Sequence, residues 1–112
     1  MGNLRIFEIA IDDILLNPAA CSLRLEQTLE RATPRRVDGM CVDDDFVYLS
    51  LIPREPGAPP EQYRFAELSE FGRDQVASGI MARYNAGFST VGSFVASDAI
   101  WALFRRDGEN RS

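Results

Sequence analysis

The chain has 112 residues, of which 46% are hydrophobic and 26% are charged, and its net charge is -5. This is the composition of one ordinary soluble domain, and it excludes a disordered, collagen-like or membrane-spanning chain. The sequence contains no histidine and no lysine, so its positive charge comes from 12 arginines against 17 carboxylates. Without histidine, the chain cannot form a Ser-His or Cys-His catalytic pair or a histidine metal site.

The sequence shows neither a targeting signal nor a membrane segment. Residues 1–5 (MGNLR) lack the basic region and the long apolar run of a signal peptide, and no apolar stretch approaches the roughly 18 residues of a membrane span. Scattered arginines in an acidic chain also lack the dense basic footprint of a nucleic-acid binder. We therefore expect a cytoplasmic protein that binds neither nucleic acid nor membranes.

Cys21 and Cys41 do not belong to a CxxC or other metal-ligand cluster. Because cytoplasmic thiols stay reduced, both are expected to be free, buried side chains, with a redox or nucleophilic thiol as the alternative. The aspartates at 43–45 offer oxygen ligands for calcium or magnesium. Adjacent turn residues project in different directions, however, and no EF-hand pattern is present, so a structural turn is favoured and no metal is expected.

The first half of the chain predicts a strand, a helix and a hairpin. Residues 4–11 are rich in branched and aromatic side chains and predict a strand that ends at two aspartates. Asn17 followed by Pro18 is typical of a helix start, and apolar residues then recur at helical spacing until Pro34 ends the helix. Residues 36–42 and 46–52 predict two strands joined by the aspartate turn.

The second half repeats this order after a linker. Residues 53–62 contain four prolines and one glycine, which predicts a semi-rigid connection. Residues 63–68 predict a strand, and a helix follows that ends at Asn85-Ala86-Gly87. Its expected apolar face carries Val76, Ile80, Met81 and Tyr84. Strands at 88–95 and 99–105 complete the half, before a polar end at 107–112.

The two halves also share residues at a constant offset of 53 positions. Gly39, Val42 and Asp45 correspond to Gly92, Val95 and Asp98, Val47-Tyr48 corresponds to Ile100-Trp101, and Leu51 corresponds to Phe104. This repetition indicates a duplicated βαββ unit. We expect one domain over residues 1–112, with pseudo-repeats 1–52 and 63–106 joined by the proline-rich linker 53–62.

The segment MARYNAGFSTVG (81–92), followed after a hairpin by IWALFRR (100–106), resembles a group of small uncharacterised βαββ domains. In that group the helix ends in a glycine before an aromatic-led strand, and the last strand ends in phenylalanine and a basic pair. Here Phe88 stands where tryptophan is usual. The resemblance covers about half of the chain. It implies a fold and brings no catalytic residues.

The predicted strands are apolar on both sides. Phe46, Tyr48 and Ile52 oppose Val47, Leu49 and Leu51, and Ala99, Trp101 and Leu103 oppose Ile100, Ala102 and Phe104. Both sheet faces should therefore be covered, whereas two helices cover only one. We expect an α+β fold with an antiparallel sheet and two helices on one face, ferredoxin-like or like a dimeric α+β barrel. The second face would close into a barrel or pack against another copy, another protein or an apolar small molecule.

Five side chains are candidates for ligand or interface contact: Tyr48, Ile100, Trp101, Phe104 and Glu8. Glu8 interrupts an apolar strand. If buried, it would be the best general-base candidate, assisted by Tyr48 or Tyr84; an exposed edge position is the favoured interpretation. Tyr48 and Trp101 hold matching positions in the two halves, where core or interface packing is favoured over an aromatic ligand platform.

These features favour a small non-enzymatic binding or assembly module that forms a homodimer through its apolar sheet face. The lack of histidine, of a cysteine cluster and of a glycine-rich phosphate loop argues against an enzyme, so no catalytic residue and no cofactor are expected. One alternative is a small-molecule-binding protein or small enzyme whose sheets enclose an apolar cavity lined by Trp101 and Tyr48. Another is an acidic inhibitor that mimics nucleic acid.

Overall fold

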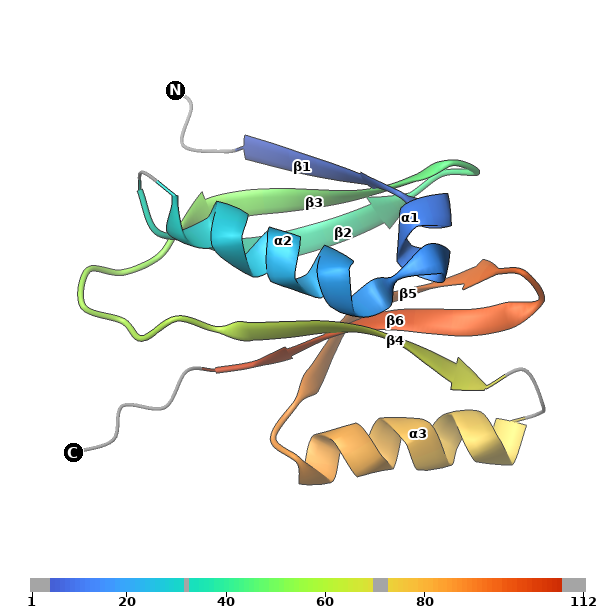
Figure 1. Ribbon diagram of the computed structural model, residues 1–112. Helices are drawn as coiled ribbons and strands as arrows, with labels where there is room; N and C mark the ends of the chain where they lie inside the picture. Colours follow the sequence, from blue (N-terminus) through green and yellow to red (C-terminus); the bar gives the residue numbers. More distant parts are fainter. Residues whose placement is uncertain (1–4, 32, 70–72, 108–112) are drawn as a thin grey trace.

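A computed structural model describes residues 5–31, 33–69 and 73–107 of the protein (Figure 1). In chain order its elements are β1 (Arg5–Ala10), α1 (Ile11–Leu16), α2 (Pro18–Glu30), β2 (Arg35–Val42), β3 (Phe46–Pro53), β4 (Gln62–Ser69), α3 (Arg73–Asn85), β5 (Ser89–Ala96) and β6 (Ala99–Arg106). None of the helices in these ranges has the length and the apolar character needed to cross a membrane. The α+β class expected from the sequence is confirmed.

The strands form two three-stranded antiparallel sheets, with the orders β1-β3-β2 and β4-β6-β5. The expectation of a single sheet, ferredoxin-like or otherwise, is therefore wrong for the described strands. The physical reason lies at the free edge of β4. The backbone N–H groups of Tyr63 and Phe65 donate to Glu26 Oε2 at 2.7 Å and to Ser22 Oγ at 2.9 Å. Helix α2 thus occupies the edge at which another strand would pair.

Helix α2 begins as the sequence predicts, and a short helix precedes it. Asn17 Oδ1 accepts a hydrogen bond from the N–H of Ala20 at 3.1 Å, and Pro18 lies in the first turn. The strand predicted to run to Ile11 ends at Ala10, and α1 follows it. Ile11 and Ile14 are both buried. A spacing of three residues places the two side chains on one face of a helix but on opposite faces of a strand. Burial of both side chains in the same core therefore favours a helix over a longer strand.

Both predicted hairpins form, and their registers coincide at the offset of 53 residues. Val37 pairs with Leu51 in the first sheet, and Thr90 pairs with Phe104 in the second. The register shifts after each of these pairs, so a β-bulge precedes Gly39 in β2 and Gly92 in β5. The two glycines therefore hold equivalent places where an edge strand bends, as predicted.

Helix α3 ends at the predicted terminator. Gly87 has a φ of +91°, its N–H donates to the carbonyl of Tyr84 at 2.9 Å, and the N–H of Phe88 donates to the carbonyl of Arg83 at 2.8 Å. This is the pair of hydrogen bonds of a Schellman motif. It satisfies carbonyl groups that the last helical turn leaves without intrahelical partners.

The apolar face predicted for α3 is wrong for the three members whose side chains are described. Ile80, Met81 and Tyr84 are 37%, 54% and 64% exposed, and the side chain of Val76 lies outside the described structure. Gly79 approaches β4 instead, because a Cβ added there would lie 3.4 Å from Leu68 Cδ2. The helix therefore packs on the sheet through a small residue, which apolar periodicity does not reveal.

One continuous core joins the two halves. Helix α2 packs against β4 of the second sheet as well as against the first sheet, and α3 covers the opposite face of the second sheet (Figure 1). The central strand β6 is thus buried on both faces, as its two-sided apolar sequence predicted. The largest fully buried side chains of this core are Ile9, Ile14, Leu25, Leu29, Val37, Val47 and Leu49 from the first half and Tyr63 and Leu103 from the second.

Candidate functional site

The first sheet has one face that no helix or strand of the described residues covers. Val47 and Leu49 point into the core and are fully buried, whereas their neighbours along β3 point away from it. Figure 1 shows the helices and the second sheet on the core side only. We call the other side the open face; its cross-strand registers place on it Ile6, Glu8, Cys41, Phe46, Tyr48, Ser50 and Ile52. Ile6 is 57% exposed, so an apolar surface meets solvent here.

Glu8 and Tyr48 are directly opposite each other on the open face. Glu8 is exposed, as the favoured interpretation of the sequence expected. The Tyr48 hydroxyl donates to Asp43 Oδ2 at 2.7 Å, and this hydrogen bond raises the pKa of Tyr48 to about 12. Its phenol therefore stays protonated at neutral pH. The pair does not form the buried general-base site that was considered.

The three aspartates form a structural turn. Asp43 Oδ1 accepts from the N–H groups of Asp45 and Phe46 at 2.8 and 2.7 Å. The hydrogen bond from Tyr48, followed by those from the two backbone N–H groups, lowers the pKa of Asp43. The Asp43 carboxylate is thereby engaged in an Asx turn. Among the described residues, no cluster of three or more carboxylates and thiols is arranged to hold a metal ion.

The other three sequence-predicted site residues lie elsewhere. Trp101 is 8% exposed and packs in the core between the two halves, and Phe104 is buried on the α3 side of the second sheet with the guanidinium of Arg83 5.5 Å from its ring. Ile100 is partly buried on that side as well. A surface role for Trp101 and Phe104 is therefore wrong, because folding of the single chain already covers them. Trp101 and Tyr48 also lie on opposite sides of the core, so they do not line a common cavity.

The two cysteines have different environments. Both are free, and Cys21 is buried, where desolvation raises the pKa of its thiol. Cys41 is exposed, which corrects the prediction that both are buried. It lies on an edge strand, opposite Tyr48 and on the open face. Its immediate neighbours Met40 and Val42 are apolar, but no layer formed by the described residues packs on that side.

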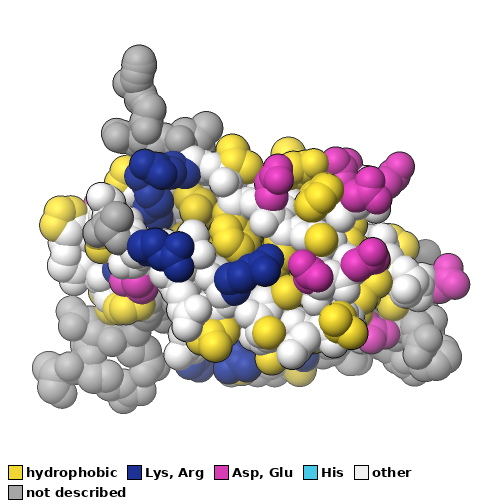
Figure 2. All heavy atoms as spheres, turned by 45° about the horizontal axis from the view of Figure 1, so that its top comes forward, with side chains coloured by type: hydrophobic (Ala, Val, Ile, Leu, Met, Phe, Trp, Pro, Cys, Tyr) yellow, Lys and Arg dark blue, Asp and Glu magenta, His cyan; other side chains and the backbone are white. Residues whose placement is uncertain are grey.

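Charge is unevenly distributed along the first sheet. On the surface that Figure 2 shows, arginines gather toward one end and carboxylates toward the other, with hydrophobic side chains between them. Within the first sheet, antiparallel pairing places the arginines that begin β1 and β2 beside the end of β3. The acidic end contains Asp12, Asp13 and the turn at 43–45. The surface in this view is therefore not a continuous acidic face.

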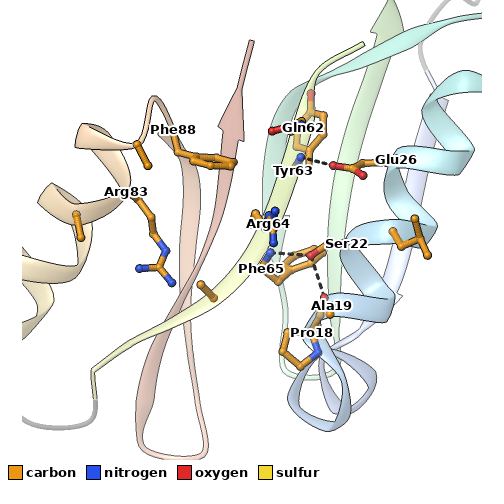
Figure 3. Close-up of a pocket in the computed structure, with 14 residues that line it drawn as sticks. Pro18, Ala19, Ser22, Glu26, Gln62, Tyr63, Arg64, Phe65, Arg83 and Phe88 are labelled. Carbon is orange, nitrogen blue, oxygen red and sulfur yellow. Dashed lines mark hydrogen bonds between the residues drawn. The ribbon is translucent and has the colours of Figure 1, made fainter. Parts of the chain in front are cut away.

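A second candidate site is a groove between α2 and α3 that the sequence analysis missed. Its floor is β4 and its volume is about 630 Å3. Figure 3 shows Ser22 and Glu26 on the α2 side, Arg83 and Phe88 on the α3 side, and Arg64 between them. The walls bring together residues from 18 to 88, so no local motif marks the site. The one sequence signal is Arg64, which stands between the aromatic residues Tyr63 and Phe65 of the predicted strand.

No family model, curated protein or solved structure matches the chain at a significant level.

Proposed function

We propose that this chain is a non-enzymatic binding and assembly module that forms a homodimer through the open face of its first sheet. One observation carries the proposal: at equivalent positions of the two halves, one side chain is covered by the rest of the chain and the other is not. Trp101 is buried between the halves, while Tyr48, at the matching position, lies on the open face with Ile6 exposed beside it. An exposed apolar sheet face of this kind is typical of a protein interaction site.

We further infer that the two halves descend from a duplicated βαββ unit. The shared strand order, the shared register and the two bulges before Gly39 and Gly92 support this origin. In the second unit, the sheet face opposite its own helix is covered by the first unit. The first unit has no such neighbour within the described chain, which leaves its matching face for another molecule.

Charge complementarity supports a second copy as the partner. Arg36 lies across from Ile52 at one end of the open face, where its side chain is 40% exposed and also pairs with Glu61 at 3.6 Å, and the aspartates at 43–45 lie next to Phe46 at the other end. A twofold axis that runs in the interface plane and across the strands would place the basic end of each copy over the acidic end of its partner. The same surface is then self-complementary in both apolar character and charge. Added salt should weaken such a dimer.

Analytical ultracentrifugation of matched variants tests the proposal. Ile6 and Val95 are both exposed strand residues, 57% and 73% exposed, but only Ile6 belongs to the open face. Ile6→Arg introduces a charge into the proposed dry contact, so it should yield monomer at concentrations at which the wild type is dimeric. Val95→Arg should remain dimeric. A wild type that is monomeric at hundreds of micromolar, or dissociation by Val95→Arg alone, would contradict this interface.

Cys41 provides an independent readout. Because it lies on the open face, its reaction with a thiol reagent should slow as the protein concentration rises and the dimer forms. Cys21 is buried in the single chain and serves as the internal reference. Both thiols are free, which suits the cytoplasmic location that we propose. A Cys41 reaction rate that does not depend on protein concentration would place the interface elsewhere.

A further inference from the structure

The α2–α3 groove is separate from the open face and combines apolar walls with positive charge. Leu23 is 54% exposed on the α2 wall, and Ala82 and Phe88 belong to the α3 wall. Arg64 and Arg83 lie in the groove, and the described structure contains no ion pair for either of them. A volume of about 630 Å3 is within the range of small-molecule sites.

Among the described residues, no ion pair joins the groove's own carboxylate, Glu26, to either arginine. Glu26 is engaged at the edge of β4, where its Oε2 accepts from the N–H of Tyr63 at 2.7 Å. Ser22 is engaged in the same way by the N–H of Phe65. The guanidinium of Arg83 lies 5.5 Å from the ring of Phe104, which orients it without supplying a negative charge. Glu26 Oε2 and Ser22 Oγ are therefore in use as acceptors at the edge of β4, while the two guanidinium groups remain as donors for a ligand.

We propose that this groove binds an amphipathic carboxylate, a small molecule with one carboxylate on an aliphatic or aromatic body. The carboxylate accepts hydrogen bonds from Arg64 and Arg83, since guanidinium groups match carboxylate geometry. The apolar body lies against Leu23, Ala82 and Phe88. This site does not depend on the homodimer, because none of these residues belongs to the open face.

Titration with octanoate, followed by amide chemical shifts in NMR spectra, tests the site, with 1-octanol as the uncharged probe of equal chain length. Octanoate should shift the amides of β4 and of the facing sides of α2 and α3, and should bind at least about tenfold more tightly than 1-octanol. Arg64→Gln/Arg83→Gln should remove this preference. Arg24→Gln/Arg31→Gln removes the same charge from the side of α2 where Arg24 lies over Phe7, and should bind like the wild type.

A blocking variant keeps the test decisive if the arginine variant folds poorly. Ala82 is an exposed residue of α3 that lines the groove, so Ala82→Phe should fill it without changing charge. It should weaken octanoate binding by about tenfold or more. The proposal is overturned if octanoate and 1-octanol bind equally, if shifts appear on the open face instead, or if Ala82→Phe binds octanoate as the wild type does. A monomeric wild type would leave the groove unaffected.

Discussion

The open face of the first sheet and the matching face of the second sheet share backbone register but differ in surroundings. At equivalent positions the first sheet has Tyr48 and Ser50, and the second has Trp101 and Leu103. Leu103 is fully buried and Trp101 nearly so, because the first half of the chain covers them. At these two positions the covered face carries the larger and more apolar side chain. The same local strand pairing permits either a covered or an open face, and the neighbouring layer decides which of the two occurs.

Replacing the two matching aromatic residues should give the largest difference. Trp101→Ala removes a nearly buried side chain and leaves a cavity, so it should lower the free energy of unfolding by about 3–5 kcal/mol. Tyr48→Ala should cost less than about 1 kcal/mol when measured on the monomer. Urea unfolding at low protein concentration makes the measurement. Equal losses would mean that the two faces are covered alike in solution.

A substitution at Ser22 tests whether helix α2 covers the edge of β4 and so keeps the two sheets separate. Its hydroxyl donates to the carbonyl of Pro18 and accepts from the buried N–H of Phe65. Ser22→Ala leaves that N–H without a partner and should cost about 1–3 kcal/mol. Thr28 makes the same type of bond, to the carbonyl of Arg24, on the exposed side of α2, so Thr28→Ala should stay within about 0.5 kcal/mol of the wild type. Losses of similar size in both variants would refute the edge-covering role.

The equivalent glycines should respond unequally. A Cβ at Gly92 would lie 2.9 Å from Met40 Sδ and 3.3 Å from its Cβ, where β5 faces β2, whereas a Cβ at Gly39 would meet only Ser50 Oγ at 3.2 Å. Gly92→Ala should therefore lower the free energy of unfolding by about 1–2 kcal/mol through overpacking. Gly39→Ala should change it by less than about 1 kcal/mol, because the Ser50 hydroxyl can rotate away. Thermal unfolding compares them, and the reverse order would contradict the packing described.

Titration of the two tyrosines distinguishes a pKa raised by a surface hydrogen bond from a pKa raised by burial. The variant used here should have the smallest effect on stability of those described. Both Tyr48 and Tyr63 have a pKa raised to about 12, chiefly by the hydrogen bond to Asp43 in the first and by desolvation in the second. Asp43→Asn should move the pKa of Tyr48 back toward 10 and leave that of Tyr63 unchanged. Tyrosinate absorbance against pH follows both, and a joint shift would contradict these separate causes.

The raised pKa of Tyr63 also sets the direction of a stability change. A phenol whose pKa is higher in the folded than in the unfolded chain stabilises the fold below pH 10, and this contribution is lost as the pH rises toward 12. The free energy of unfolding should therefore fall between these values. In Tyr63→Phe this alkaline slope should become shallower.

Local signals in the sequence predicted most of the elements. The Asn17-Pro18 helix start, the aspartate turn and the Gly87 terminator act within a few residues, so the sequence alone reveals them. The short helix α1 was missed because burial of Ile11 and Ile14 selected it over an extended strand. The exposed side of α3 was assigned to the core, since the helix packs through Gly79 instead.

The candidate sites were predicted less completely. Glu8 and Tyr48 were identified, and the register places them together. Arg64 and Arg83 were missed, because α2 and α3 bring them into one groove from separate parts of the chain.

Local patterns in the sequence specify the elements other than α1, in their order along the chain, and the two hairpins, because turns, caps and alternation depend on neighbouring residues. Contacts between distant segments decide that α2 covers the edge of β4, that the strands divide into two sheets, and that Trp101 is buried while Tyr48 remains on the open face. These outcomes depend on which surfaces of distant segments meet. A strand apolar on both sides must be covered, but its own residues do not specify by what.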